Sequence, residues 1–129
     1  TTSAMKTIDR VVNVFPPEQQ TQIRMQLAGT LQGIIAQTLV PKIAGGRIAA
    51  LEILVATDGV RAMIREGKMA QLVSTMQTGK KFGMQVLEDH LNELVASRII
   101  SYEQAVEKAN SPDTIRRPGG VPRPVGVGA

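Results

Sequence analysis

Apolar residues recur at helical spacing in the first quarter of the chain and predict two helices. Ser3 can cap the first helix, whose apolar stripe consists of Ile8, Val11, Val12 and Phe15. Pro16-Pro17 ends that helix, and Pro17 suits the first position of the next one. We expect the second helix to run to about Gln37. Its predicted buried face consists of Ile23, Leu27, Leu31, Ile34 and Ile35.

The pattern then changes to the alternation that is typical of strands. Extended segments at residues 39–43 and 47–55 flank Gly45-Gly46, which predicts a β-hairpin at about residues 38–55. In the second segment, Glu52 shares one face with Ile48, Ala50 and Leu54. It is either a general base or a structural carboxylate paired with an arginine. We favour the structural carboxylate, because a lone buried charge is costly.

Four helices are expected after the hairpin. The first is capped by Thr57 or Asp58 and stopped by Gly67, and the second is stopped by Gly79. Ser101 and Gln104 match a capping box for the last one. The apolar positions of the four helices are Val60, Met63 and Ile64; Met69, Leu72, Val73 and Met76; Met84, Leu87, Leu91, Leu94 and Val95; and Ala105, Val106 and Ala109.

Composition shifts at Pro112, where prolines and glycines begin to alternate. We therefore interpret residues 1–111 as one mainly helical domain with one β-hairpin, and residues 112–129 as a flexible tail. The tail contains three arginines, Arg116, Arg117 and Arg123. They either contact an anionic partner or only keep the tail soluble, and we favour the second interpretation.

Length and composition narrow the classes of function. The chain has 129 residues, 43% of them apolar, which is enough for one compact core. It has no cysteine, so disulfides, thiolate metal sites and cysteine nucleophiles are excluded. The net charge of +4 permits contact with nucleic acid or an acidic membrane face, but the basic residues are dispersed. No apolar run of membrane-spanning length occurs. The N-terminus has no initiator methionine, so we expect that the chain begins in the middle of a longer one, through processing or because it is a fragment.

The sequence contains no phosphate-binding loop of the form G-x-x-x-x-G-K-[ST]. Gly67-Lys68 is followed by Met69, and Gly79-Lys80 by Lys81, so neither pair has the hydroxyl that holds magnesium. We interpret both glycines as helix stops. The single histidine, His90, stands among acids in a predicted helix without a nucleophile motif. We therefore expect no catalytic residue and no metal ligand set.

Residues 59–66 predict a short helix with Arg61 and Arg65 on one side. Two interpretations remain open at this point. These arginines form either an ordinary solvated basic face or a docking surface for a partner subunit.

Several blocks, in the same order, resemble the PilT-type ATPases, the retraction motors of type IV pili in the secretion ATPase superfamily. Residues 7–12 and 15–20 resemble the stretch after that family's histidine box, and residues 41–47 with 52–54 resemble its hairpin. Val60–Glu66 is similar to its Ala-Ile-Arg-Asn-Leu-Ile-Arg-Glu retraction motif, with Gly59, Val60, Ala62 and Met63 as departures. Residues 77–79 and 82–85 complete a resemblance that covers about residues 1–117.

The resemblance implies an α/β fold, the C-terminal part of a RecA-like P-loop ATPase. It implies a parent that binds ATP and Mg²⁺, forms a homo-hexamer, and acts in the cytoplasm on a pilus platform protein of the inner membrane. The Walker motifs of the parent would lie upstream, so this segment alone should be inactive and bind no nucleotide. Neither nucleic acid nor a membrane span is implied.

The same resemblance implies roles for particular residues. The retraction surface would consist of Arg61, Ile64, Arg65 and Glu66. Arg47, beside the glycine turn, would reach a nucleotide or a neighbouring subunit. The alternative functions are a stand-alone helical adaptor and a nucleic-acid-binding module. The second lacks an aromatic stacking platform, because aromatics make up only 2% of the chain.

Overall fold

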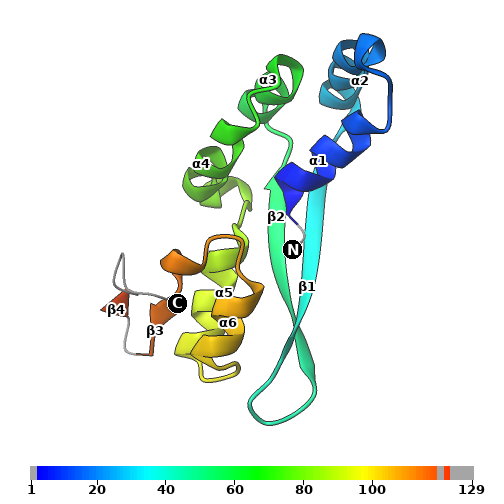
Figure 1. Ribbon diagram of the computed structural model, residues 1–129. Coiled ribbons are helices and arrows are strands. Elements are labelled where there is room, and N and C mark those ends of the chain that lie inside the picture. Colours follow the sequence, from blue (N-terminus) through cyan, green and yellow to red (C-terminus); the bar gives the residue numbers. More distant parts are fainter. Residues whose placement is uncertain (1–2, 119–120, 123–129) are drawn as a thin grey trace. The chain divides into compact units, whose positions relative to one another are not determined.

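The computed structural model describes residues 3–118 and 121–122, which form two compact units (Figure 1). The α1–α4 unit comprises residues 3–36 and 52–86, and the α5–α6 unit comprises residues 37–51 together with the described residues from 87 onward. Strands β1 (Gly33–Pro41) and β2 (Arg47–Val55) form a two-stranded hairpin. The open end of this hairpin belongs to the α1–α4 unit, and its turn belongs to the α5–α6 unit.

The described part of the α1–α4 unit holds four α-helices and one 3-10 helix. Their bounds are α1 (Ala4–Asn13), α2 (Pro17–Thr30), α3 (Asp58–Glu66), α4 (Ala70–Thr78) and η1 (Lys80–Phe82). Ser3 caps α1 as predicted, because its Oγ accepts a hydrogen bond from the amide of Lys6 at 3.1 Å. Gly79 follows α4 directly, again as predicted.

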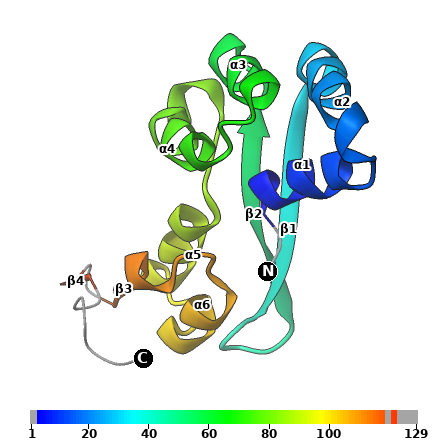
Figure 2. The ribbon, with the colours of Figure 1, turned by 45° about the horizontal axis from the view of Figure 1, so that its top comes forward.

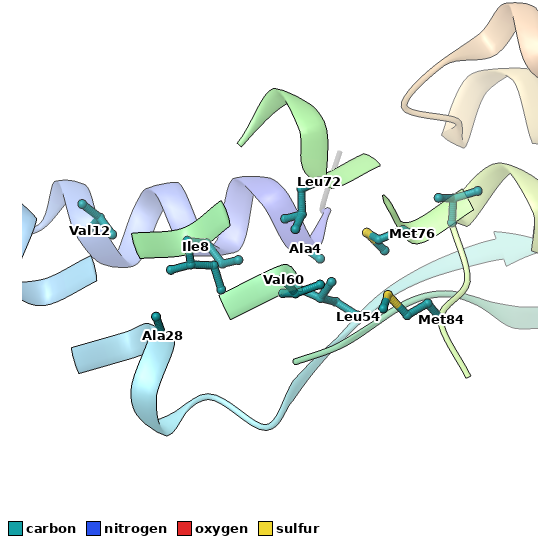
Figure 3. Packing of buried hydrophobic residues seen from close by; sticks show 11 residues of the cluster. Ala4, Ile8, Val12, Ala28, Leu54, Val60, Leu72, Met76 and Met84 are labelled. Atoms are coloured by element: carbon teal, nitrogen blue, oxygen red, sulfur yellow. The ribbon is translucent and has the colours of Figure 1, made fainter. Parts of the chain in front are cut away.

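Apolar side chains from the four α-helices and from β2 form one core. Figure 3 shows Ile8 of α1, Val60 of α3 and Leu72 of α4 turned toward one another beside Leu54 of β2. Each of these four side chains is at most 1% exposed. Burying such a side chain contributes about 1.5–3 kcal/mol, so this core accounts for the mutual packing of the unit's helices.

Helices α2 and α3 lie side by side in both ribbon views (Figures 1 and 2). The contact places Ala28, which is fully buried, between them, with Ile23 and Leu27 packed against the same core. This pairing determines the surroundings of α3, which carries the residues of the predicted retraction surface.

The α5–α6 unit has its own core around α5 (Leu87–Ala96) and α6 (Tyr102–Lys108). It also holds η2 (Pro112–Thr114) and a short antiparallel pair, β3 (Arg116–Arg117) with β4 (Val121–Pro122). The hairpin turn is fixed to the α5–α6 connection, because the amide of Ile43 donates to the carbonyl of Ile99 at 2.9 Å. Gly45 and Gly46 adopt φ values of +102° and +73°, which explains the glycines in this turn.

The predicted end of the second helix is wrong. The helix α2 ends at Thr30, not near Gln37, and strand β1 begins at Gly33, ahead of the predicted hairpin start near residue 38. Residues 34 and 35 fit a helical stripe and a strand equally well. Pairing with the long apolar strand β2 decides between them. As a result, Ile35, predicted to be buried, is 69% exposed.

Two smaller expectations also change. Met84 is buried but precedes α5, because Gln85 forms an antiparallel bridge with Ile53 through bonds of 2.7 and 2.9 Å. Within the predicted tail, Ile115 is fully buried in the core of the α5–α6 unit. Residues 119–120 and 123–129, including Arg123, lie outside the described residues, so the flexible tail stays a prediction there.

Gly29 in the last turn of α2 and Gly33 at the start of β1 should respond oppositely to alanine. A Cβ at Gly33 would meet the carbonyl oxygen of Leu54 at 2.9 Å, whereas a Cβ at Gly29 would meet nothing within 4 Å. We expect Gly33→Ala to lower the free energy of unfolding by about 1–3 kcal/mol. Gly29→Ala should raise it by about 0.5–1 kcal/mol through helix propensity. Urea unfolding of the two variants measures both changes, and equal effects would contradict the strand start at Gly33.

Candidate functional site on helix α3

Helix α3 is fixed at both ends by its own sequence. At its start, Thr57 Oγ1 accepts a hydrogen bond from the amide of Val60 at 3.4 Å. At its end, Gly67 adopts φ +70°, and the amides of Gly67 and Lys68 donate to the carbonyls of Ile64 and Met63. This is the Schellman arrangement, which needs a left-handed residue at Gly67. The nine-residue helix therefore has defined ends and a defined rotation.

The four residues predicted to form one retraction surface do not share one environment. Ile64 is fully buried in the core of the α1–α4 unit, and Arg61 is half-buried. Arg65 and Glu66 are exposed. The structure thus divides the predicted set into two residues that face inward and two that face solvent.

Arg61 is bound to the end of helix α2. Its Nη1 donates a hydrogen bond to the carbonyl oxygen of Ala28 at 2.6 Å. Carbonyls in the last turn of a helix lack partners within the helix and carry partial negative charge, and α2 has no basic residue of its own there. The positively charged Arg61 guanidinium compensates the partial negative charge of these carbonyls, so it anchors α3 to α2.

A second arginine makes the reverse contact, from α2 to the end of α3. A Cβ added at Gly67 would lie 3.6 Å from Nε of Arg24, so the Arg24 side chain lies against the C-cap of α3. Arg24 is half-buried. Each helix therefore places a guanidinium at the C-terminal end of the other, which fixes the position of α3 within its unit.

Arg65 and Glu66 remain available for contact with another molecule. Lys68 Nζ lies 3.7 Å from the Glu66 carboxylate, and both side chains are more than half exposed. An exposed pair of this kind contributes little to stability. The last turn of α3 and the residues after it therefore present a mixed cluster of Arg65, Glu66 and Lys68 on a rigid support.

Glu52 holds the N-terminus of helix α1. The side chain is 6% exposed, and Oε2 accepts a hydrogen bond from the amide of Ala4 at 2.8 Å. The first amides of a helix lack partners within the helix and attract negative charge. Glu52 thus acts on the backbone of α1, and its assignment as a structural carboxylate paired with an arginine stays a prediction. We propose no catalytic role for it.

We expect Glu52→Gln to lower the free energy of unfolding by about 1–3 kcal/mol, because it replaces a charge-assisted bond to the Ala4 amide with a neutral one. Thermal or urea unfolding measures the change. The exposed Glu66→Gln, which removes the same charge, should stay within about 0.5 kcal/mol of the original chain. Equal effects of the two substitutions would rule out the anchoring role of Glu52.

Arg47 stands at the start of β2 and is exposed, but it belongs to the α5–α6 unit, whereas α3 belongs to the α1–α4 unit. Arg47 and the α3 cluster thus belong to different units. Its contact with a nucleotide or a neighbouring subunit stays a prediction.

Two polar side chains in the α5–α6 unit, buried Glu88 and half-buried His90, make contacts that were not foreseen from the sequence. Oε2 of Glu88 accepts hydrogen bonds from the amides of Asn110 and Ser111, at 2.6 and 2.9 Å. Nδ1 of His90 accepts a hydrogen bond from the amide of Leu51 at 2.9 Å. Glu88 and His90 both bind backbone amides, and such partners leave no pattern in the sequence.

Neither a metal site nor a membrane span is found in the part of the chain that the structure describes. Within residues 3–118 and 121–122, no three His, Cys, Asp or Glu side chains are grouped closely enough to hold a metal ion. In the same residues, no helix combines the length and apolar character that a membrane crossing requires.

The chain is similar to pilus motor proteins along most of its length. It is 53% identical over 113 residues to the type IV pilus retraction ATPase PilT of Pseudomonas aeruginosa, which covers 88% of the chain and 33% of that relative. It is 40% identical over 116 residues to the twitching motility protein of Neisseria gonorrhoeae, covering 89% of the chain and 31% of the relative. No protein-family model matches the chain.

A solved structure of the pilus retraction motor PilT with bound ADP has the same fold in the matched part. Its TM-score is 0.77 at 41% sequence identity, over 87% of this chain and 31% of that one. The predicted fold, a mainly helical segment with one hairpin from the C-terminal part of such ATPases, is confirmed. The chain spans about a third of the length of the relatives it matches.

Proposed function

We propose that this chain acts as the C-terminal portion of a hexameric ATPase that powers type IV pilus retraction. The supporting observation is the similarity to PilT over 113 residues at 53% identity. In this role the chain supplies the output surface and subunit packing. The upstream two thirds of the parent supply the phosphate loop and the Walker B acid, where ATP and Mg²⁺ bind. The parent works in the cytoplasm, at the inner membrane, on a pilus platform protein.

In the proposed mechanism, helix α3 is a rigid output element. ATP binding and hydrolysis upstream change how neighbouring subunits pack, and this movement reaches α3 through the core of the α1–α4 unit. Arg61 and Ile64 keep α3 fixed to that core, so the helix moves with the unit. Arg65 and Glu66 at its exposed end contact the partner that receives the motion.

The hairpin offers further support for a role within a longer protein. Along β1, Ile35 and Leu39 are 69% and 47% exposed, on the face opposite buried Ala36 and Val40. Two exposed large aliphatic residues on one face of a strand, with Gln37 between them, suit a surface that packs against another element. We propose that the remainder of the parent ATPase covers this face.

ATP turnover tests whether hydrolysis resides in the upstream part of the parent and not in this chain. The test protein is a chimera in which this chain replaces the matched 113 residues of the Pseudomonas aeruginosa PilT. The chimera should hydrolyse ATP at a rate close to that of the parent PilT, because the phosphate loop is retained. The 129-residue chain alone should show no turnover and no ATP binding. Turnover by the chain alone, or a stable hexameric chimera without turnover, would refute the proposal.

A further inference from the structure

The α5–α6 unit contains a groove that the proposed motor function does not use. Its volume is about 490 Å³, within the range of about 300–1,000 Å³ that is usual for ligand sites. Three aliphatic side chains form much of its wall: Ile43 beside the hairpin turn, Val95 of α5 and Ile100 between α5 and α6. The groove therefore offers an apolar surface of a size that accommodates two or three side chains.

Two arginines add positive charge to this apolar wall. Arg98 and Arg117 both line the groove and are exposed. The guanidinium carbon of Arg117 lies 4.8 Å from the centre of the Tyr102 ring, a cation–π distance that holds this side chain in place. Glu103 also lines the groove, so the charged groups of the lining sum to a single positive charge.

Arg98 occupies a backbone position that normally belongs to glycine. Its φ is +59°, the only left-handed value among the described residues other than glycine. The amide of Arg98 donates to the carbonyl of Val95, and the amide of Ile99 donates to that of Leu94. These two bonds make the Schellman end of α5. An arginine here carries a conformational cost that glycine avoids, and such strain is commonly found where the side chain has a function.

The Tyr102 hydroxyl is a further polar group without a partner. It is buried and has no hydrogen-bond partner among the described residues, although Tyr102 lines the groove. By contrast, Oγ of Ser101 is already bound to the amide of Gln104 at 3.1 Å. The groove thus offers few directional groups, too few for a polar metabolite, but its two guanidinium forks match a carboxylate.

We propose that this groove binds a peptide segment of a partner protein that carries one carboxylate beside an apolar side chain. The apolar side chain packs on Ile43, Val95 and Ile100, and the carboxylate pairs with Arg98 and Arg117. Because Glu103 repels additional negative charge, a singly charged carboxylate fits better than a doubly charged phosphate.

An NMR titration of the 129-residue chain tests this proposal. The probe is acetyl-Leu-Asp-Leu-amide, and the matched control is acetyl-Leu-Asn-Leu-amide, which has the same shape without the charge. The Asp peptide should shift the amides of Ile43, Ile100 and Tyr102 saturably, and the Asn peptide should bind about tenfold more weakly. Equal binding of the two peptides would overturn the proposal, as would tighter binding of inorganic phosphate.

Arg98→Gly distinguishes a loss of peptide binding from a loss of folding, because it should lower the affinity for the peptide while it stabilises the fold. The substitution should lower the affinity for the Asp peptide about fivefold or more. It should also raise Tm by roughly 2–5 °C, because glycine relieves the left-handed strain.

Arg117→Ala should lower the affinity for the Asp peptide to a similar extent. Arg116→Ala removes the same charge outside the groove lining and should leave affinity unchanged. Undiminished binding by Arg98→Gly or Arg117→Ala would overturn the proposal. So would saturable binding of a peptide of residues 123–129 at these amides, since the groove would then belong to the chain's own end.

Discussion

Arg65→Ala, placed in the PilT chimera, is expected to abolish pilus retraction while ATP turnover continues. Arg65 is exposed at the end of a helix whose position is fixed by other residues, so its loss removes a contact without moving the helix. An arginine at the centre of an interface contributes about 2 kcal/mol or more when truncated, which corresponds to a loss of more than about tenfold. Retraction speed in living cells and ATP turnover of the purified chimera are the two measurements.

A matched control distinguishes the output surface from a general effect of charge. Lys6 is exposed on α1 of the same unit, and Lys6→Ala removes one positive charge as well. We expect Lys6→Ala to leave retraction unchanged. Normal retraction by the Arg65→Ala chimera would remove Arg65 from the output surface, whatever the control shows.

Ile64→Ala is expected to act through folding instead, although Ile64 lies one residue before Arg65. Its side chain is fully buried in the core of the α1–α4 unit. Truncation of a buried isoleucine leaves a cavity and lowers the free energy of unfolding by about 2–5 kcal/mol. Urea unfolding of the 129-residue chain measures the effect. Ile64→Val, which removes one methylene group, should cost about 0.5–1.5 kcal/mol.

The comparison with Arg65 makes this prediction specific. Arg65→Ala should change the free energy of unfolding by no more than about 1 kcal/mol, because its exposed side chain lies outside the core and contributes only the helix-dipole interaction of a basic residue in the last turn. If Ile64→Ala were as mild as Arg65→Ala, the inward placement of Ile64 would be wrong. The retraction motif would then form a single exposed surface, as the sequence resemblance implies.

Local signals in the sequence predicted much of the fold. Ser3, Thr57 and Ser101 cap the helices that they were expected to cap, and Gly67 ends α3 in the left-handed conformation. These features depend on residues a few positions apart, so a single sequence contains the whole signal. The alternation of buried and more exposed positions along β2 could be predicted for the same reason. Glu52 is buried on the same face of the strand as Ala50 and Leu54.

Interactions over long sequence distances could not be predicted in this way. Arg61 binds a backbone carbonyl 33 residues away, and any residue at position 28 would present that carbonyl. The two arginines of the α3 helix therefore look alike in sequence and differ only in the folded protein. The switch from α2 to β1 likewise depends on the partner strand β2. The groove depends on side chains from the hairpin turn, α5, α6 and β3, which only the fold assembles.

Pilus retraction by the PilT chimera itself tests the central claim most directly. The claim is that residues 1–117 perform the work of the C-terminal part of a retraction ATPase. In cells that lack their own retraction motor, the chimera should restore retraction, and the 129-residue chain alone should not. A chimera that assembles and hydrolyses ATP but fails to retract pili would contradict the claim.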